Sequence, residues 1–158
     1  MNKLVEAKNI IKNNIYLTLG TVNKEGDGWV TPLFFAYDKK YNFYWISPKG
    51  SVHAKNSSRN PNSTIVIYDS QTPKWTGIAV WVRVTVEKLK IKTEIQDGLK
   101  CIFDRLKEPV WPLEKVTGKA IYRAYRAIPN KFWITDDVKI NGETVDARTE
   151  INLNELDE

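Results

Sequence analysis

Residues 78–88 are the most regular segment of the sequence, and they constrain the fold more than any other stretch. Aliphatic residues occupy every second position from Ile78 to Val86, and the positions between them are mostly polar or aromatic. A period of two predicts a β-strand with one buried and one solvent-facing side, as in antiparallel sheets. The protein is therefore expected to be built on an antiparallel sheet.

The other segments favour a mainly β (α+β) fold. Short β-forming runs separated by turn residues predict strands at 15–22, 29–37, 43–47, 63–69, 119–128 and 131–135, with a thin strand near 150–153 after an Asn141-Gly142 turn. Apolar residues at helical spacing predict helices at 3–13 and 93–107. Pro32 lies inside one strand, so that strand should be at an edge or bulged. Many short strands with few helices are typical of a β-barrel with peripheral helices.

Length, cysteine content and charge predict the number of domains, the location of the protein and the kind of surface it has. A chain of 158 residues predicts a single domain over 1–158. The sequence has no apolar run long enough to span a membrane and no signal-peptide pattern, and its single cysteine favours a cytoplasmic location. Positions 1–135 carry 22 basic and 11 acidic residues, whereas positions 136–158 carry eight acidic and two basic ones. The basic residues are scattered, so solvated surfaces are expected and nucleic-acid binding is not.

The stretch 43–61 predicts an anion-binding corner. An aromatic strand ends at a Pro-Lys-Gly break, Ser51 follows in the N-cap position, and a polar run stops at an Asn-Pro pair. The N-terminus of a helix presents unpaired N–H groups and a partial positive charge. Lys49, His53 and Lys55 lie beside it, so we expect a phosphate to bind there.

Several catalytic and metal chemistries are excluded. One histidine and one cysteine cannot build His-based or thiolate metal sites, and no glycine-rich nucleotide loop occurs. A serine hydrolase would need His53, but Ser51 is two residues away, and side chains at i and i+2 of a helix point apart. Ser47 would meet His53 only by an accident of the fold. We expect neither a hydrolase nor a metal site.

Three tryptophans leave two interpretations open. Trp29 and Trp45 lie in predicted strands, and Trp75 lies in a loop of turn residues. Aromatic residues in strands usually pack in a core or a dimer interface. They can also stack on a planar ligand, and neither interpretation excludes the other.

From about Ile10 to Leu89, the order of these segments resembles the pyridoxamine 5′-phosphate oxidase-like FMN-binding split-barrel family. The likeness rests on the strand with Trp29-Val30-Thr31-Pro32, the strand Phe43-Tyr44-Trp45-Ile46-Ser47, and the spacing from Ser47 through Ser51, His53 and Asn56 to Asn60-Pro61. It implies an antiparallel split β-barrel that forms a homodimer, with FMN in the groove between the subunits.

The resemblance and the aromatic candidates together give eleven cofactor-binding residues: Trp29, Val30, Thr31, Pro32, Trp45, Ile46, Ser47, Ser51, His53, Gln71 and Trp75. Ser47 and Ser51 match residues that bind the FMN phosphate. The 30–32 segment would lie along the isoalloxazine ring, and Gln71 and Trp75 would reach it from the facing subunit.

The sequence departs from the family in its fixed positive charge. His53 stands where the true oxidases carry a lysine, and the arginine and lysine of their second strand are absent. Lys49, Lys55 or a protonated His53 are the residues left to supply that charge.

The C-terminal part argues against the oxidase activity itself. Phe132-Trp133 resembles a Phe-Trp pair of the oxidase. The basic motif that follows this pair in the oxidase and binds the vitamin phosphate has no counterpart here, apart from a weak similarity at Asp146-Ala147-Arg148. The leading hypothesis is an FMN-dependent oxidoreductase of unknown substrate with no catalytic side chain assigned. A non-enzymatic protein that binds or senses flavin, deazaflavin or haem, with His53 as the axial ligand of haem, stays open as the alternative.

Overall fold

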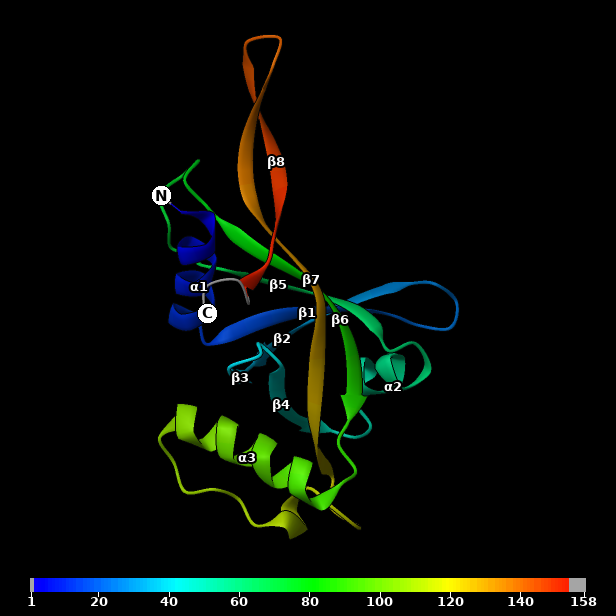
Figure 1. The fold of residues 1–158 in the computed structure, drawn as a ribbon. Coiled ribbons are helices and arrows are strands. Elements are labelled where there is room, and N and C mark those ends of the chain that lie inside the picture. The colour runs from blue at the N-terminus through cyan, green and yellow to red at the C-terminus, as the bar shows by residue number, and fades with distance from the viewer. Residues whose placement is uncertain (1, 154–158) are drawn as a thin grey trace.

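The computed structural model describes residues 2–153, and their strands form one antiparallel sheet (Figure 1). Its strands follow the order β2 (Gly28–Phe34), β1 (Tyr16–Val22), β5 (Asn62–Tyr68), β6 (Ala79–Lys88), β7 (Tyr122–Ile140), β4 (Phe43–Pro48) and β3 (Ala36–Tyr37). An eighth strand, β8 (Glu143–Ile151), pairs with β7 outside this path. The alternating segment is the central strand β6, and its valines from Val80 to Val86 are all buried, as predicted.

The sheet closes into a barrel because its two end strands are consecutive in the chain. Only Phe35 separates β2 from β3, and its N–H donates to the carbonyl oxygen of Ile15 at 3.2 Å. The strand predicted over 29–37 is therefore two strands that belong to opposite ends of the strand order. Closure confirms the predicted mainly β barrel, and Pro32 lies on β2, an end strand, as expected.

Three helices cover the barrel from outside, as predicted: α1 (Lys3–Asn13), α2 (Val52–Arg59) and α3 (Lys92–Leu106). A 3₁₀ turn, Leu113–Lys115, follows α3. Leu99 and Phe103 of α3 pack against Tyr44 on the outer side of β4, while the barrel interior is filled by a separate apolar cluster that includes Trp45. None of the helices within residues 2–153 is long and apolar enough to cross a membrane.

The two strands predicted around Pro129-Asn130 are one strand of 19 residues, β7. Its pairing with β6 passes from Arg83↔Lys131 to Val84↔Pro129, so Asn130 is an extra residue at a β-bulge. Proline lacks the N–H that a regular ladder needs, and a bulge accommodates it without ending the strand. The turn prediction at this position was wrong for that reason.

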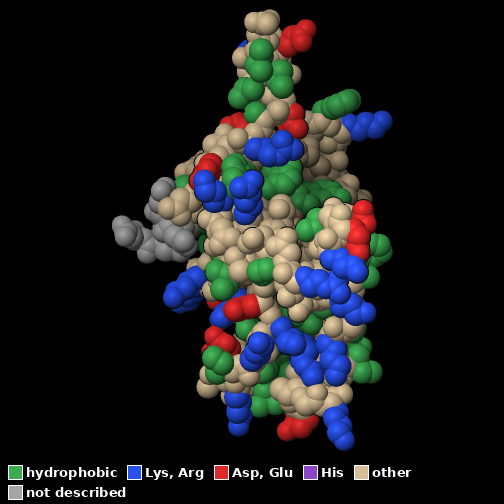
Figure 2. Space-filling view, turned by 90° about the vertical axis from the view of Figure 1, so that its right-hand side faces the viewer, with side chains coloured by type: hydrophobic (Ala, Val, Ile, Leu, Met, Phe, Trp, Pro, Cys, Tyr) green, Lys and Arg blue, Asp and Glu red, His purple; other side chains and the backbone are tan. Residues whose placement is uncertain are grey.

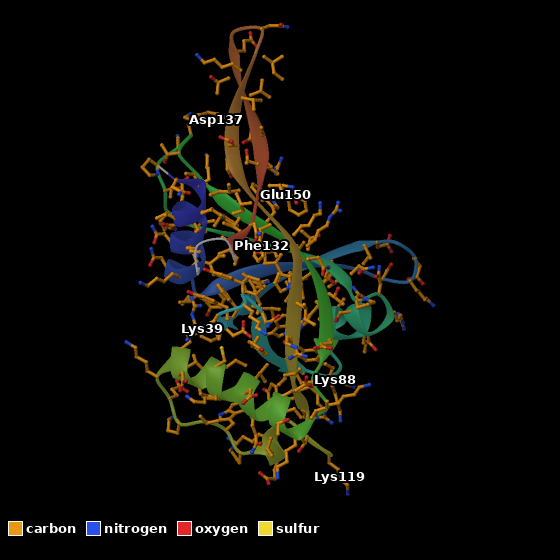
Figure 3. The ribbon with its side chains drawn as sticks, viewed as in Figure 1. Lys39, Lys88, Lys119, Phe132, Asp137 and Glu150 are labelled. Carbon is orange, nitrogen blue, oxygen red and sulfur yellow. The ribbon has the colours of Figure 1, made fainter. Side chains whose placement is uncertain are left out.

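The ends of β7 and β8 form a two-stranded arm that projects from the barrel (Figure 1). Asp137 lies well out along the arm, and Phe132 and Glu150 lie near its base (Figure 3). The predicted thin strand is thus a strand of nine residues. Asn141 and Gly142 at the tip both have positive φ, which the predicted type I′ turn requires. Three acidic residues of the predicted acidic tail, at 155, 157 and 158, lie outside the described residues.

Candidate functional site

The predicted corner lies where β4 ends and α2 begins. Phe43, Trp45 and Ser47 share one side of β4 and point into the barrel, so the Ser47 hydroxyl lies at the inner end of this row. Ser51 is the N-cap of α2, as predicted, with φ −64° and ψ 155°. Its hydroxyl makes no capping hydrogen bond and is directed elsewhere.

A buried Ser-His-Ser cluster fills this corner. The Nε2 atom of His53 is 2.9 Å from Ser47 Oγ and 3.2 Å from Ser51 Oγ. His53 is 6% exposed and Ser47 is 2% exposed. The expectation that neither serine would meet His53 was wrong, because Ser51 has extended rather than helical dihedral angles and the rule for i and i+2 in a helix does not apply to it.

This cluster is not a hydrolase triad. Burial lowers the pKa of His53 from its ordinary value of 6.5, so the imidazole is neutral at pH 7. Within residues 2–153, no carboxylate hydrogen-bonds to His53 to hold its orientation. A neutral His53 also cannot supply the positive charge that the sequence led us to consider there.

A chain of hydrogen bonds links the corner to the edge strand β2. The side-chain amide of Asn56 in α2 donates to Thr21 Oγ1 at 3.1 Å, and Thr21 Oγ1 donates to the carbonyl oxygen of Trp29 at 3.4 Å. Asn56 and Thr21 are 3% and 5% exposed. We call this the Asn56–Thr21–Trp29 relay. Thr21 was not predicted, although it follows Leu17 and Leu19 at an inward position of β1, where a polar residue needs a partner.

Strand β2 offers an accessible edge beside the corner. An end strand leaves half of its backbone N–H and C=O groups without a neighbouring strand. Trp29 is 50% exposed and Val30 is 68% exposed, and Pro32 is exposed as well. The hydroxyl of Thr31 is buried and has no hydrogen-bond partner among the described residues. That hydroxyl faces inward with Leu33, whereas Val30 and Pro32 face outward. The outward side of the strand therefore combines apolar contact surface with unpaired backbone groups along its edge, which suits a flat heterocycle.

The remaining predicted site residues do not join the corner. Trp45 is buried in the barrel and stacks on Tyr125 with ring centroids 6.0 Å apart, so it packs in the core. Ile46 faces the other side of β4 and packs with the α3 cluster. Gln71 hydrogen-bonds to residues of its own loop, and Trp75 is 100% exposed with a φ of 68°.

Positive charge surrounds the corner from outside. Lys49 and Lys55 are exposed, and neither side chain forms an ion pair with another described residue. The first turn of α2 contains no acidic residue that would cancel the positive end of its dipole. An anion at the corner would thus meet hydroxyl groups inside and ammonium groups at the rim.

Comparison with known proteins identifies the family. A family model described as pyridoxamine 5′-phosphate oxidase matches residues 5–101, more than half of the chain. The chain belongs to the pyridoxamine 5′-phosphate oxidase family. The matched region contains the corner, the relay and the β2 edge. No sequence among the curated proteins matches the chain.

Solved structures share the fold at low sequence identity. A candidate 5-nitroimidazole antibiotic resistance protein from Bacteroides thetaiotaomicron is 15% identical, with a TM-score of 0.71 over 85% of this chain and 84% of that chain. HutZ, a haem storage protein from Vibrio cholerae, is 17% identical, with a TM-score of 0.67 over 80% of this chain and 89% of that chain. An FAD-binding protein from Mesorhizobium loti is 17% identical, with a TM-score of 0.64 over 82% and 91%. These identities show a common fold alone and confirm the predicted split barrel.

Proposed function

We propose that the chain is a flavoprotein that binds FMN non-covalently as a cytoplasmic homodimer and acts as an oxidoreductase on a substrate that stays unassigned. The Asn56–Thr21–Trp29 relay carries this proposal. It ties the helix at the anion-binding corner to the edge strand that suits a ring. By the resemblance seen in the sequence, the FMN phosphate would lie at the corner and the isoalloxazine ring along the edge strand.

The β2 edge fits the flavin ring. Val30 and Pro32 lie on one side of the strand and offer apolar contact, and the unpaired backbone groups along the edge offer hydrogen bonds to a polar ring edge. A bound flavin would supply the hydride chemistry, and the chain would orient it.

The corner fits the FMN phosphate through neutral donors. Ser47, Ser51 and the free N–H groups at the start of α2 can donate to phosphate oxygens, and a neutral His53 can donate through Nε2. The phosphate would take over hydroxyl contacts that His53 makes in the structure. The balancing charge would come from Lys49 and Lys55 at the rim.

The outer surface of the barrel supports a homodimer. Val66, Trp81 and Trp133 lie directly opposite one another on β5, β6 and β7, and each is only partly buried. Guanidinium groups cover the two indoles, with Arg148 over Trp81 at 4.3 Å. Trp and Arg are enriched at the centres of protein interfaces.

Two alternatives lose support from the geometry. Haem ligation by His53 would require Nε2 to leave Ser47 and Ser51 and to reach iron from a buried position. The hint of a vitamin-phosphate site at Arg148 is weakened because its guanidinium packs over Trp81. We therefore propose neither a haem protein nor pyridoxamine phosphate oxidase activity.

An absorption spectrum and an FMN titration test the proposal. The purified protein should be yellow, or the apoprotein should bind added FMN and quench its fluorescence. Ser51→Ala should weaken FMN binding by about tenfold, because it removes one hydrogen bond to a charged group. Thr144→Ala, which removes an exposed hydroxyl on β8, is the control and should change nothing. A colourless protein that does not bind added FMN would refute the proposal, and a Soret band would favour haem.

A further inference from the structure

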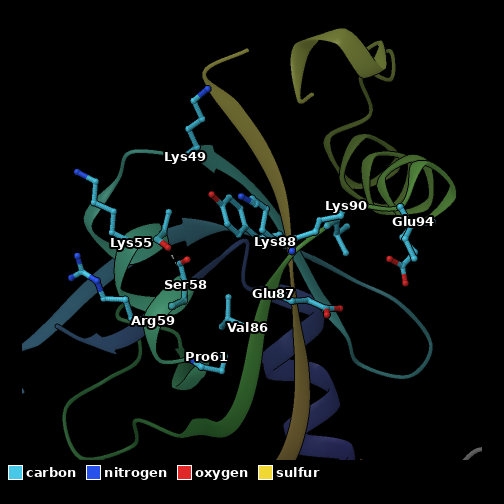
Figure 4. Close-up of a pocket in the computed structure, with 15 residues that line it drawn as sticks. Lys49, Lys55, Ser58, Arg59, Pro61, Val86, Glu87, Lys88, Lys90 and Glu94 are labelled. Atoms are coloured by element: carbon cyan, nitrogen blue, oxygen red, sulfur yellow. Dashed lines mark hydrogen bonds between the residues drawn. The ribbon is translucent and has the colours of Figure 1, made fainter. Parts of the chain in front are cut away.

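A groove of about 650 Å³ lies between α2, the end of β6 and the start of α3 (Figure 4). Five cationic side chains line it, from α2, from the end of β6 and from the two loops next to them: Lys49, Lys55, Arg59, Lys88 and Lys90. Figure 4 shows Lys55 and Arg59 on the α2 side and Lys90 and Glu94 on the side of α3. Apolar groups, among them Val86 and the ring of Tyr125, complete the lining.

The five cations have no acidic partner among residues 2–153. The two acidic residues of the groove, Glu87 and Glu94, both bind Arg126, with Arg126 Nε 2.6 Å from Glu87 and a terminal nitrogen 3.1 Å from Glu94. The one guanidinium offsets one of the two carboxylate charges, so the five cations still outnumber the negative charge left at the groove. Figure 2 shows Lys and Arg side chains gathered on the lower half of the face that includes α2.

This arrangement favours a ligand with several negative charges. Like charges around one hollow repel when they lie within about 8–10 Å, the screening length at physiological salt. A polyanion removes that repulsion and gains attraction from every cation that it contacts. Burial raises the pKa of Tyr125, so its phenol stays protonated and can donate a hydrogen bond.

The groove begins where the phosphate corner ends. Lys49 precedes the N-cap Ser51 by two residues, and the N–H of Lys55 donates to the Ser51 carbonyl in the first turn of α2. The inward side of α2 carries His53 and Asn56, and its outward side lines the groove. The corner and the groove thus meet at the N-terminal end of α2.

We propose that this groove binds a chain of two or more anionic groups that continues beyond the phosphate at the corner. The inference rests on the proposed function, because it takes the first phosphate to be that of the flavin. Two sources share the chemistry: an anionic tail on the cofactor itself, or a separate phosphorylated substrate.

The test uses calorimetric titration of the full chain with FMN, FAD and inorganic tripolyphosphate, the last with and without FMN. The double variant Lys88→Gln/Lys90→Gln removes two groove cations and leaves the corner intact. Lys119→Gln/Lys139→Gln removes the same charge from exposed positions elsewhere and is the matched control. We expect the groove variant to weaken tripolyphosphate by about tenfold and FMN by less than twofold, with no change in the control.

The pattern across ligands decides between the sources. If the groove variant also loses about tenfold for FAD, the tail belongs to the cofactor; if only tripolyphosphate is affected, it belongs to a separate ligand. Equal losses in the groove variant and the control, or no loss in either, would overturn the groove site. A protein that binds tripolyphosphate through Lys88 and Lys90 but no flavin would overturn the proposed function, together with the continuation from a flavin phosphate, and leave only an anion site.

Discussion

The Asn56–Thr21–Trp29 relay makes a quantitative prediction about coupling between the helix and the edge strand. Asn56→Ala removes the donor of the 3.1 Å bond to Thr21 at a position that is 3% exposed. The loss of a buried hydrogen bond, with a small cavity, should lower the free energy of unfolding by about 1–3 kcal/mol. A domain with a stability of about 5–15 kcal/mol stays folded after that loss.

Thr21→Val tests the same bond from its other end. Valine keeps the shape of the side chain but leaves the Asn56 amide and the Trp29 carbonyl without their shared partner. Its cost should also be about 1–3 kcal/mol. Because the Asn56–Thr21 bond can be lost only once, the double variant should cost about 1 kcal/mol less than the sum of the single variants.

Urea unfolding of the four proteins measures this coupling, and FMN titration of the same proteins measures its effect on the site. The control cycle pairs Asn56→Ala with Thr117→Val, whose hydroxyl bonds to Leu113 within its own loop. That pair should be additive within about 0.5 kcal/mol. Additivity of Asn56→Ala and Thr21→Val within the same limit would refute the relay.

Three further variants probe the corner, the loop and the core. His53 is the only histidine, and burial lowers its folded pKa below 6.5, so the folded state takes up its proton less readily than the unfolded state. The contribution of His53 to the free energy of unfolding should therefore be constant above about pH 7. Below about pH 6.5 it should fall, by at most about 1.4 kcal/mol per pH unit. Urea unfolding of His53→Asn at several pH values should show that this fall is lost. Trp75→Ala should change the free energy of unfolding by less than about 0.5 kcal/mol, because the side chain is fully exposed. It should weaken FMN binding about three- to tenfold, because Trp75 is proposed to stack on the ring. A large loss of stability with unchanged FMN binding would make Trp75 a structural residue instead. Gly98→Val should destabilise by about 1–3 kcal/mol in urea, because a Cβ there would lie 3.1 Å from Leu89 and 3.2 Å from Tyr44, and an unchanged midpoint would contradict that packing.

The barrel strands were predictable where one side of a strand is buried, because apolar residues then occupy every second position of the sequence. The Pro129-Asn130 pair shows the limit of this signal. A proline followed by asparagine is common in turns, and only the pairing of β7 with β6 reveals a bulge inside one long strand. The length of β8 was missed for a related reason: the arm is solvated on both sides, so its residues carry no burial pattern.

The candidate site was predictable at the level of segments but not of contacts. Ser51 was correctly placed at the N-cap, yet the direction of its side chain depends on extended dihedral angles that a helical rule does not describe. The groove cations are up to 41 positions apart in the sequence, between Lys49 and Lys90, and scattered charge of this kind normally indicates a solvated surface. The pairing of β4 and β6 with the same part of β7 brings their ends together, and no local sequence pattern predicts that pairing.

The presence of His53 where a lysine was expected follows from where the residue lies. A lysine at this position would place an ammonium group at a site where the present side chain is 6% exposed, without a carboxylate among the described residues to pair with it. A neutral imidazole avoids that desolvation cost and still offers a donor to the two hydroxyls or to a phosphate. The cations lie instead at the rim and along the groove, where they stay hydrated and attract anions from a distance. In the proposed function, attraction and positioning would thus be separated: exposed lysines would attract the anion, and buried neutral donors and the α2 N-terminus would fix its orientation.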